Sequence, residues 1–289
     1  MKLTAQADFY IEKYGPQKGI EILRNLGYQN IIYTLAARVL EPFLDENKDA
    51  EMRKKFEEIR DAAKDAEVNI LFTTMKEEIY SDLFTCIPDA KIANVKAAIK
   101  ATSYMGCEML AVRPICFRKS IPNAWEETKK VTYQIYGGAK KDADSLGVKI
   151  AFLNTTKQLC FSSGTYSYGC NAEDLIELAD EFESGVVINP VYALKSGEKV
   201  EEMLDKIGDK VIGFMIDDKT QRIESQGMPF FGAVDYYGLI RYFETHPSDM
   251  AMVMTYSSIM NRYSEFADDM EFVEALTKAF KNVACVIAR

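Results

Sequence analysis

The stretch that decides the fold reads Ile207-Gly208-Asp209-Lys210-Val211-Ile212-Gly213-Phe214-Met215-Ile216-Asp217-Asp218. A segment with helical periodicity ends at a glycine, the residue that takes the left-handed cap conformation at little steric cost. An apolar run without polar alternation follows, as in a strand covered on both faces of a parallel sheet. Two carboxylates stand where that strand ends. The stretch therefore predicts a helix-to-strand junction of an α/β protein, with polar side chains at the carboxyl end of the strand.

The same pattern recurs along the whole chain. Apolar runs start roughly every 25 to 40 residues, close to the length of one βα unit. Between the runs, apolar residues fall at helical spacing, as at Leu175, Leu178 and Phe182, so that each helix has one apolar stripe to lay on a sheet. The expected strands are Lys2–Ala7, Asn30–Leu35, Asn69–Thr74, Glu108–Arg113, Val148–Asn154, Gly185–Asn189, Lys210–Ile216 and Met250–Thr255.

Eight strands that alternate with about eight helices predict a closed barrel. An open doubly wound sheet usually carries a G-x-G-x-x-G loop after its first strand, whereas this chain continues with residues 8–15, Asp8-Phe9-Tyr10-Ile11-Glu12-Lys13-Tyr14-Gly15. No Pro/Gly/Ser-rich linker or low-complexity segment divides the chain. We therefore expect one domain over residues 1–289, a single (β/α)8 TIM barrel, with its functional side chains at the carboxyl ends of the strands.

Composition and charge exclude several classes of partner. The chain has 289 residues, is 48% hydrophobic and 27% charged, and carries a formal net charge of −9. An acidic surface repels phosphate backbones and anionic lipids, so we expect neither a nucleic-acid nor a membrane partner. No apolar stretch reaches the roughly 18–20 residues of a spanning helix, and residues 1–8 lack the apolar core of a signal peptide. We expect a cytoplasmic protein whose six scattered cysteines are free thiols.

The residues at the predicted strand ends are polar and mixed in charge. Amides, Arg and Lys bind oxygen atoms in fixed geometry, so this set suits a hydroxyl-rich or anionic small molecule. Proton transfer without a metal needs two opposed acid/base groups, for which the chain offers Asp217, Asp218 and Lys157. The candidate binding residues are Arg113, Asn154, Asn189, Tyr192, Arg222 and Thr255.

Four segments, in their order and spacing, resemble one known family. Residues 20–28, 143–151 and 210–218 are helix-glycine-strand or strand-carboxylate units, and residues 228–235 form a proline–glycine loop before the last βα unit. Together they resemble the xylose-isomerase-like sugar-phosphate isomerase/epimerase family, over residues 1 to about 280. The resemblance implies a protein that binds a sugar, a sugar phosphate or a polyol at the carboxyl-terminal face of its barrel.

The resemblance also implies a divalent metal, held by Glu, Asp, His and Glu on strands five to eight, often with a second His. The one histidine of this chain, His246, stands on a loop expected at the opposite face, and Tyr192 takes the place of the second His. Sites for Zn²⁺ or Fe²⁺ rest on imidazole and carboxylate ligands. We therefore expect that family-type metal catalysis is lost and that no cofactor is bound. The four ligand positions hold Leu153, Asn189, Met215 and Thr255.

Several alternatives stay open at this point. Asp217, Asp218 and Glu224 offer an oxygen-only site for Mg²⁺ or Mn²⁺. A second reading is an active isomerase or epimerase with a redesigned site, either metal-free or Mg²⁺-dependent. A third reading is a non-catalytic interaction or regulatory barrel, which would expose an apolar patch of interface size over the strand ends. The sequence leaves enzyme status, substrate and oligomeric state undecided, since fold does not fix function.

Overall fold

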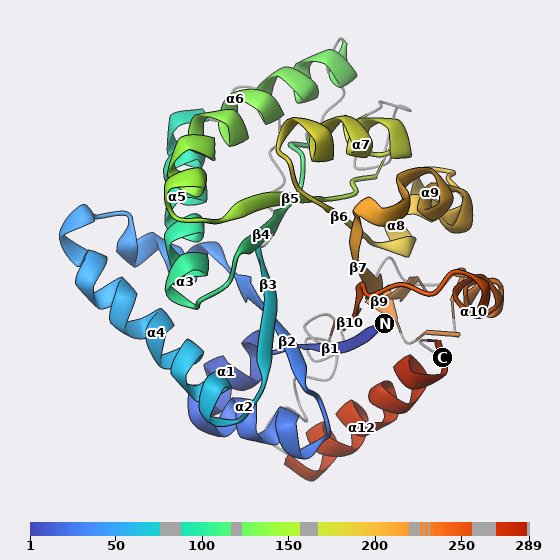
Figure 1. The fold of residues 1–289 in the computed structure, drawn as a ribbon, viewed down its shortest axis with the longest axis horizontal. Helices are drawn as coiled ribbons and strands as arrows, with labels where there is room; N and C mark the ends of the chain where they lie inside the picture. The colour runs from blue at the N-terminus through green and yellow to red at the C-terminus, as the bar shows by residue number, and fades with distance from the viewer. Residues whose placement is uncertain are drawn as a thin grey trace.

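The structure, a computed structural model, describes residues 1–75, 88–116, 123–156, 167–219, 226–227, 229–230, 232–255 and 270–287. Eight parallel strands close into a barrel, in which the last strand pairs back on the first (Figure 1). This confirms the (β/α)8 TIM barrel expected from the sequence. The strands are β1 (Lys2–Gln6), β2 (Asn30–Leu35), β3 (Asn69–Met75), β4 (Met109–Val112), β5 (Lys149–Leu153), β6 (Val186–Ile188), β7 (Val211–Ile216) and β10 (Ala251–Met254).

Helices form the outer layer around this barrel (Figure 1). Short 3₁₀ helices lie at Glu41–Phe43, Glu46–Lys48 and Gly208–Lys210, and a small antiparallel pair, β8 (Asp218–Lys219) and β9 (Gln226–Gly227), follows β7. The α-helices are α1 (Asp8–Tyr14), α2 (Pro16–Asn25), α3 (Ala37–Leu40), α4 (Asp49–Asp65), α5 (Pro88–Tyr104), α6 (Ala124–Ser145), α7 (Ala172–Glu181), α8 (Pro190–Lys195), α9 (Val200–Ile207), α10 (Tyr236–Thr245) and α12 (Met270–Ile287).

The strands are buried on both faces, as their apolar sequences predict. On β2, Tyr33 packs outward in the layer between barrel and helices and touches Phe56 of α4, whereas Ile32 points into the barrel. Residues two apart on a strand point the same way, so each strand supplies both layers in alternation. The interior cluster contains Ile32, Phe72, Cys107, Ala111, Ala151, Leu153, Val187, Met215, Ala251 and Val253.

The carboxyl-terminal helix α12 closes the ring of helices against the amino-terminal ones (Figure 1). The hydroxyl of Tyr10 in α1 shares a buried, short hydrogen bond with that of Thr277 in α12. Lys281 of the same helix donates to the carbonyl of Leu26 at 2.8 Å. The first and last helices are therefore joined directly, as barrel closure requires.

Among the described helices, none is long and apolar enough to cross a membrane. Among the cysteines that the structure describes, Cys107, Cys116 and Cys170 are buried and Cys285 is exposed, and no two of them form a disulfide. Cys86 and Cys160 lie outside the described residues.

Candidate functional site

Strand alternation places polar side chains inside the mouth of the barrel, which is the end where the carboxyl ends of the strands lie. Ile32, Phe72, Ala111, Val187, Met215 and Val253 face the interior, so the residues two positions later on each strand face inward at the carboxyl end. Gln6 of β1 joins them through a hydrogen bond to Thr34. On β5 the inward residue is the apolar Leu153. We call the following set the polar ring: Gln6, Thr34, Thr74, Arg113, Asn189, Asp217 and Thr255.

Asp217 is the buried carboxylate of the polar ring, with 2% of its surface exposed. Its Oδ2 accepts a hydrogen bond from Asn189 Nδ2 at 2.7 Å, and its Oδ1 accepts one from the Thr255 hydroxyl. Burial raises the pKa of Asp217 to about 6, and the nearby Asp218 adds to the effect, while the two hydrogen bonds and the charge of Arg113 oppose it. Asp217 therefore changes protonation close to neutral pH, which is typical of functional carboxyl groups.

A pair of asparagines orients the donor to Asp217. Asn154 Nδ2 donates to the Asn189 carbonyl at 3.0 Å, and the Asn189 backbone N–H donates to Asn154 Oδ1 at 2.7 Å. Asn189 also caps α8, because its Oδ1 accepts from the backbone N–H groups of Val191 and Tyr192. With these bonds made, the Asn189 amide has one orientation, and its NH₂ group points at the carboxylate.

Arg113 brings a positive charge to this part of the mouth. Its guanidinium carbon lies 4.0 Å from the ring centre of Tyr192, a cation–π contact. Its charge lowers the pKa of Asp217, which places the two side chains within electrostatic reach across the strand ends. The hydroxyl of the buried Tyr136 donates to the Arg113 carbonyl at 2.5 Å and holds the backbone at that point.

Asp218 has a different environment from its neighbour. It is fully buried, with one carboxylate oxygen accepting from the Gly232 N–H at 2.9 Å and the other from the Val234 N–H at 3.1 Å. Both bonds tie the segment after β9 to the end of β7. Adjacent residues of a strand point to opposite sides, so Asp217 and not Asp218 belongs to the polar ring. These contacts describe a side chain that fixes a loop, and a catalytic role for Asp218 stays a prediction.

The structure thus brings most of the candidate residues together at one side of the mouth. Arg113, Asn154 and Asn189 lie with Asp217, and Tyr192 and Thr255 touch members of that group. Lys157, Arg222 and Glu224 lie outside the described residues. Their roles remain predictions.

Sequence reasoning missed the other side of the polar ring. Thr34 accepts from Gln6 at 2.9 Å, and Thr74 donates to Thr34 at 3.0 Å, so three neighbouring strands are linked through side chains. Asp8 lies beside them, and no group in the described part of the chain donates to its buried Oδ1. Burial raises the pKa of Asp8 to about 6. One feature of the sequence could have indicated these residues: each stands two positions after a residue of an apolar strand.

In the described part of the mouth, the donor set differs from the metal site that the resemblance implies. Within the described ranges, no group of three or more His, Cys, Asp or Glu side chains is placed to hold a metal ion. Both oxygens of Asp217, and the side-chain oxygens of Asn154 and Asn189, already accept hydrogen bonds from the protein. A metal ion would therefore have to displace existing protein donors at each of these atoms.

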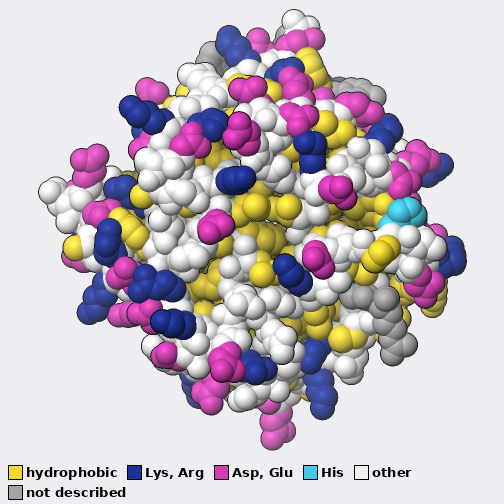
Figure 2. Space-filling view, viewed as in Figure 1, with side chains coloured by type: hydrophobic (Ala, Val, Ile, Leu, Met, Phe, Trp, Pro, Cys, Tyr) yellow, Lys and Arg dark blue, Asp and Glu magenta, His cyan; other side chains and the backbone are white. Residues whose placement is uncertain are grey.

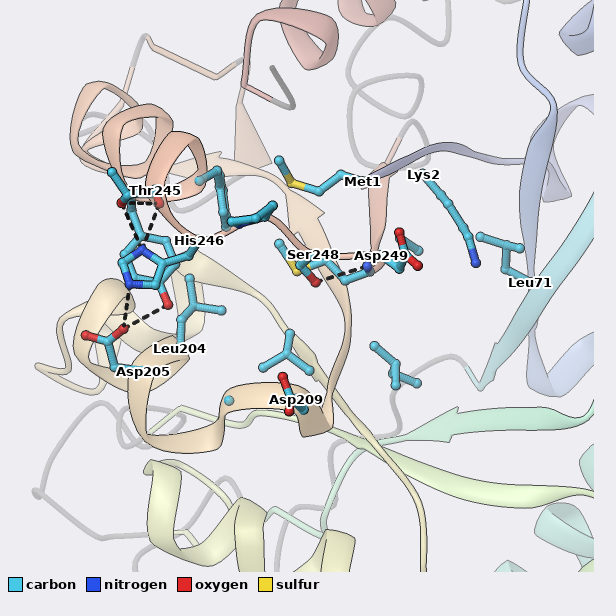
Figure 3. Close-up of a pocket in the computed structure, with 18 of the residues that line it drawn as sticks. Met1, Lys2, Leu71, Leu204, Asp205, Asp209, Thr245, His246, Ser248 and Asp249 are labelled. Atoms are coloured by element: carbon cyan, nitrogen blue, oxygen red, sulfur yellow. Dashed lines mark hydrogen bonds and ion pairs between the residues drawn. The ribbon is translucent and has the colours of Figure 1, made fainter.

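A cavity of about 1190 Å³ opens at the opposite end of the barrel, where the strands begin (Figure 3). It is lined by Phe72 of the interior cluster and by Leu71 and Ile212, which are partly buried and pack against that cluster. Figure 2 shows this face, with hydrophobic side chains gathered in its centre and charged ones around them. We assign the candidate site to the mouth and not to this cavity, because the inward polar side chains and the buried carboxylate Asp217 stand at the mouth.

His246 lies at the edge of that cavity, as the sequence predicts (Figure 3). Its ring stacks on Tyr242 with the ring centres 4.2 Å apart, and its Nδ1 lies 2.9 Å from the Thr245 hydroxyl and 3.0 Å from the Tyr242 carbonyl. These contacts finish the last turn of α10. His246 is a structural residue at the face opposite the polar ring.

The one tryptophan of the chain, Trp125, lies at the rim of the mouth beside β5. Trp125 Nε1 donates to both carboxylate oxygens of Asp174 at 3.2 Å, and Asp174 also accepts from the Gly169 N–H at 2.9 Å. The indole meets the Tyr168 ring edge-on, with ring centres 5.5 Å apart. Trp125 therefore packs α6 against α7 and the residues that lead into it.

Comparison with known proteins identifies solved structures that share this fold. No protein-family model and no curated protein matches the sequence. Among solved structures, a putative xylose isomerase from Rhodospirillum rubrum is similar at 16% identity, with 98% of this chain and 97% of that chain covered and a TM-score of 0.74. A D-psicose 3-epimerase from Clostridium cellulolyticum, solved with D-tagatose, matches at 13% identity over all of both chains, with a TM-score of 0.70.

A third structure, of an IOLI protein with a bound zinc atom, matches at 16% identity, with 100% of this chain and 98% of that chain covered and a TM-score of 0.69. The chain shares the TIM-barrel fold of these solved structures. At the level of fold, this confirms the resemblance read from the sequence.

Proposed function

We propose that this protein binds a sugar, a sugar phosphate or a polyol at the polar ring, without family-type metal catalysis. The observation that carries the proposal is the arrangement around Asp217, in which a buried carboxylate accepts hydrogen bonds from an oriented amide and a hydroxyl and has its pKa lowered by the charge of Arg113. Carboxylate and amide groups exchange hydrogen bonds with hydroxyls, and guanidinium donates to carbonyl or anionic oxygens. Tyr192 adds an aromatic surface beside these polar groups.

The polar ring also argues against the interaction-barrel alternative. A protein that used the strand ends only for docking would present contiguous apolar surface there. The described inward residues at the mouth are polar on every barrel strand but β5. A small hydroxyl-rich ligand uses such a surface better than an apolar protein face does.

The first test is a thermal-shift screen on protein washed with a chelator. The compounds are D-tagatose, D-fructose, D-fructose 6-phosphate and myo-inositol, each with and without Mn²⁺ or Zn²⁺. A ligand present at a hundred times its Kd adds about 2.7 kcal/mol to the free energy of unfolding, so we expect at least one compound to raise Tm without metal.

Two variants locate the binding. Asn189→Ala removes the donor to Asp217 and should abolish the shift, whereas Lys199→Ala, on the exposed start of α9, should retain it. The proposal fails if no compound raises Tm, or if a compound does so only when a divalent metal is added.

A second candidate function is proton transfer on a ketose, with Asp217 as acid or base. The elevated pKa of Asp217 favours it, because a group that titrates near the working pH both accepts and releases a proton efficiently. Such transfer in D₂O places deuterium on the carbon next to the ketose carbonyl. Proton NMR of D-fructose and D-tagatose should show loss of that signal with the parent protein and none with Asp217→Asn. Equal exchange by both proteins would remove Asp217 from this role.

A further inference from the structure

We infer that the guanidinium of Arg113 is the built-in cation of this site and fills the electrostatic role that a divalent metal has in the resembled family. The inference rests on the proposed function only in placing a ligand at the polar ring. Arg113 balances the charge of Asp217 and presents fixed positive charge to an oxygen of the ligand. The site then needs no metal ion to supply that charge.

The oxygen atoms that could bind a metal ion at this site already accept hydrogen bonds from the protein. A bound metal ion needs oxygen lone pairs that point at one place. Here Asn189 and Thr255 donate to the two oxygens of Asp217, and Val191 donates to the amide oxygen of Asn189. Among the described residues, the acceptor oxygens of Asp217 and Asn189 are therefore already engaged by protein donors.

Arg113 is directed into the mouth of the barrel. Strand alternation directs it inward from β4, two residues after the interior Ala111. It lies over the Tyr192 ring at 4.0 Å and within electrostatic reach of Asp217. A guanidinium stacked on an aromatic face holds its edge N–H groups in one plane, a geometry suited to bind oxygen in a fixed direction.

Tyr192 stands at a position that has a histidine in the resembled family. The family places a second histidine at this position, and the aromatic ring that stands here instead carries a cation on its face. The substitutions at Asn189 and Tyr192 are thus consistent with each other, because an arginine stacked on tyrosine needs neither imidazole nor a second carboxylate. Arginine remains charged at all physiological pH values, and chelators do not remove it.

The decisive test measures a metal and needs no sugar. The double variant Asn189→Asp/Thr255→Glu adds two carboxylates to the site, and the triple variant also carries Arg113→Gln. We expect the triple variant to bind Mn²⁺ at least tenfold more tightly than the double variant by titration calorimetry, because the internal cation no longer opposes the metal. A difference below threefold would overturn the inference, as would Mn²⁺ binding by the parent protein that Asp217→Asn abolishes.

A second measurement decides the matter if the triple variant does not fold. Arg113→Gln should lower Tm at pH 8, because Asp217 is then buried without its cation, and adding Asp217→Asn should restore at least half of that loss. Arg113→Lys should lose less than Arg113→Gln, since it keeps the charge. If adding Asp217→Asn to Arg113→Gln lowers Tm further, the two side chains are not a pair and the inference is wrong.

A ligand-binding experiment distinguishes this inference from the proposed function. With chelator-washed protein and D-tagatose as the probe, we expect Arg113→Gln to abolish the thermal shift and Arg113→Lys to keep part of it. A shift that persists in Arg113→Gln overturns the inference and leaves the proposed function standing. If D-tagatose and the other compounds shift nothing, the proposed function fails, and the Mn²⁺ comparison still decides the role of Arg113.

Discussion

The carboxyl group of Asp217 is buried, and that of Asp8 is partly buried with its Oδ1 out of contact with water. Burial raises the pKa of each to about 6 from the ordinary 3.8. A carboxyl whose pKa is raised on folding binds its proton more tightly in the folded state than in the unfolded state. Its contribution to stability is fully present below pH 3.8 and is lost as the pH rises through 6. Ionised at neutral pH, these groups oppose folding.

We predict that Asp217→Asn gains stability over the parent protein as the pH rises. Raising a carboxyl pKa from 3.8 to about 6 corresponds to about 3 kcal/mol. The difference in free energy of unfolding between variant and parent should therefore change by about 2–3 kcal/mol from pH 4 to pH 8. Urea unfolding followed by circular dichroism at the two pH values measures it, with the exposed Asp209→Asn as control. A difference that does not depend on pH would mean that water reaches Asp217.

The residues of the site were only partly predictable from the sequence. Asp217 and Asp218 are adjacent and chemically identical, so no pattern of residue types separates them, and only strand direction assigns one to the mouth and the other to a loop. Thr34 and Thr74 are polar residues inside apolar strands, which sequence reasoning took for strand interior. Asn154 bonds across two strands, a relation that depends on register and that no local pattern contains.

The strands themselves were readable nearly to the residue. Expected and observed bounds of the second strand are the same, Asn30–Leu35, and those of the third differ by one residue at its end. The reason is physical: a strand that is covered on both faces favours apolar residues at most of its positions, so the apolar run marks the length of strand that the helices cover. The lengths of the segments after the strands carry no such constraint.

Gly19 of α2 lies directly against the backbone of α1. A Cβ atom added there would lie 2.6 Å from the Tyr10 carbonyl oxygen and 2.9 Å from the Ile11 backbone nitrogen. Backbone atoms cannot rotate away as a flexible side chain does. The absence of a side chain at this position thus sets the spacing of the helix pair that follows β1.

We predict that Gly19→Ala destabilises the protein by about 1–3 kcal/mol, because the two helices must separate. The matched control is Gly137→Ala, an exposed position inside α6 with no atom within 4 Å of an added Cβ. It should stabilise the protein by about 1 kcal/mol through helix propensity alone. Urea unfolding of both variants gives the comparison. Stabilisation by both substitutions would show that α1 and α2 can shift at little cost.

At the scale of the whole molecule, closure of the barrel depends on contacts between parts of the chain that are far apart in sequence. The Tyr10–Thr277 hydrogen bond spans 267 positions and is buried between the first and last helices. Such a bond contributes only when the complete ring of βα units has formed. It therefore reports on global folding and not on any single unit.

We predict that Thr277→Val lowers the free energy of unfolding by about 1–3 kcal/mol, since the Tyr10 hydroxyl is then buried without this partner. The double variant Tyr10→Phe/Thr277→Val should recover most of that loss, because both polar groups are gone and the shape is kept. A double-mutant cycle by urea unfolding measures the coupling. Additive losses would mean that water satisfies the Tyr10 hydroxyl in the single variant.

The tie between Trp125 and Asp174 gives this protein a built-in optical reporter. Indole emission changes in colour and intensity with the polarity around the ring and with the group that holds its N–H. Because the chain has a single tryptophan, all of its indole emission comes from one place, the rim of the barrel beside β5. Any ligand or partner that disturbs that rim would be visible in the native protein, without a dye and without a mutation.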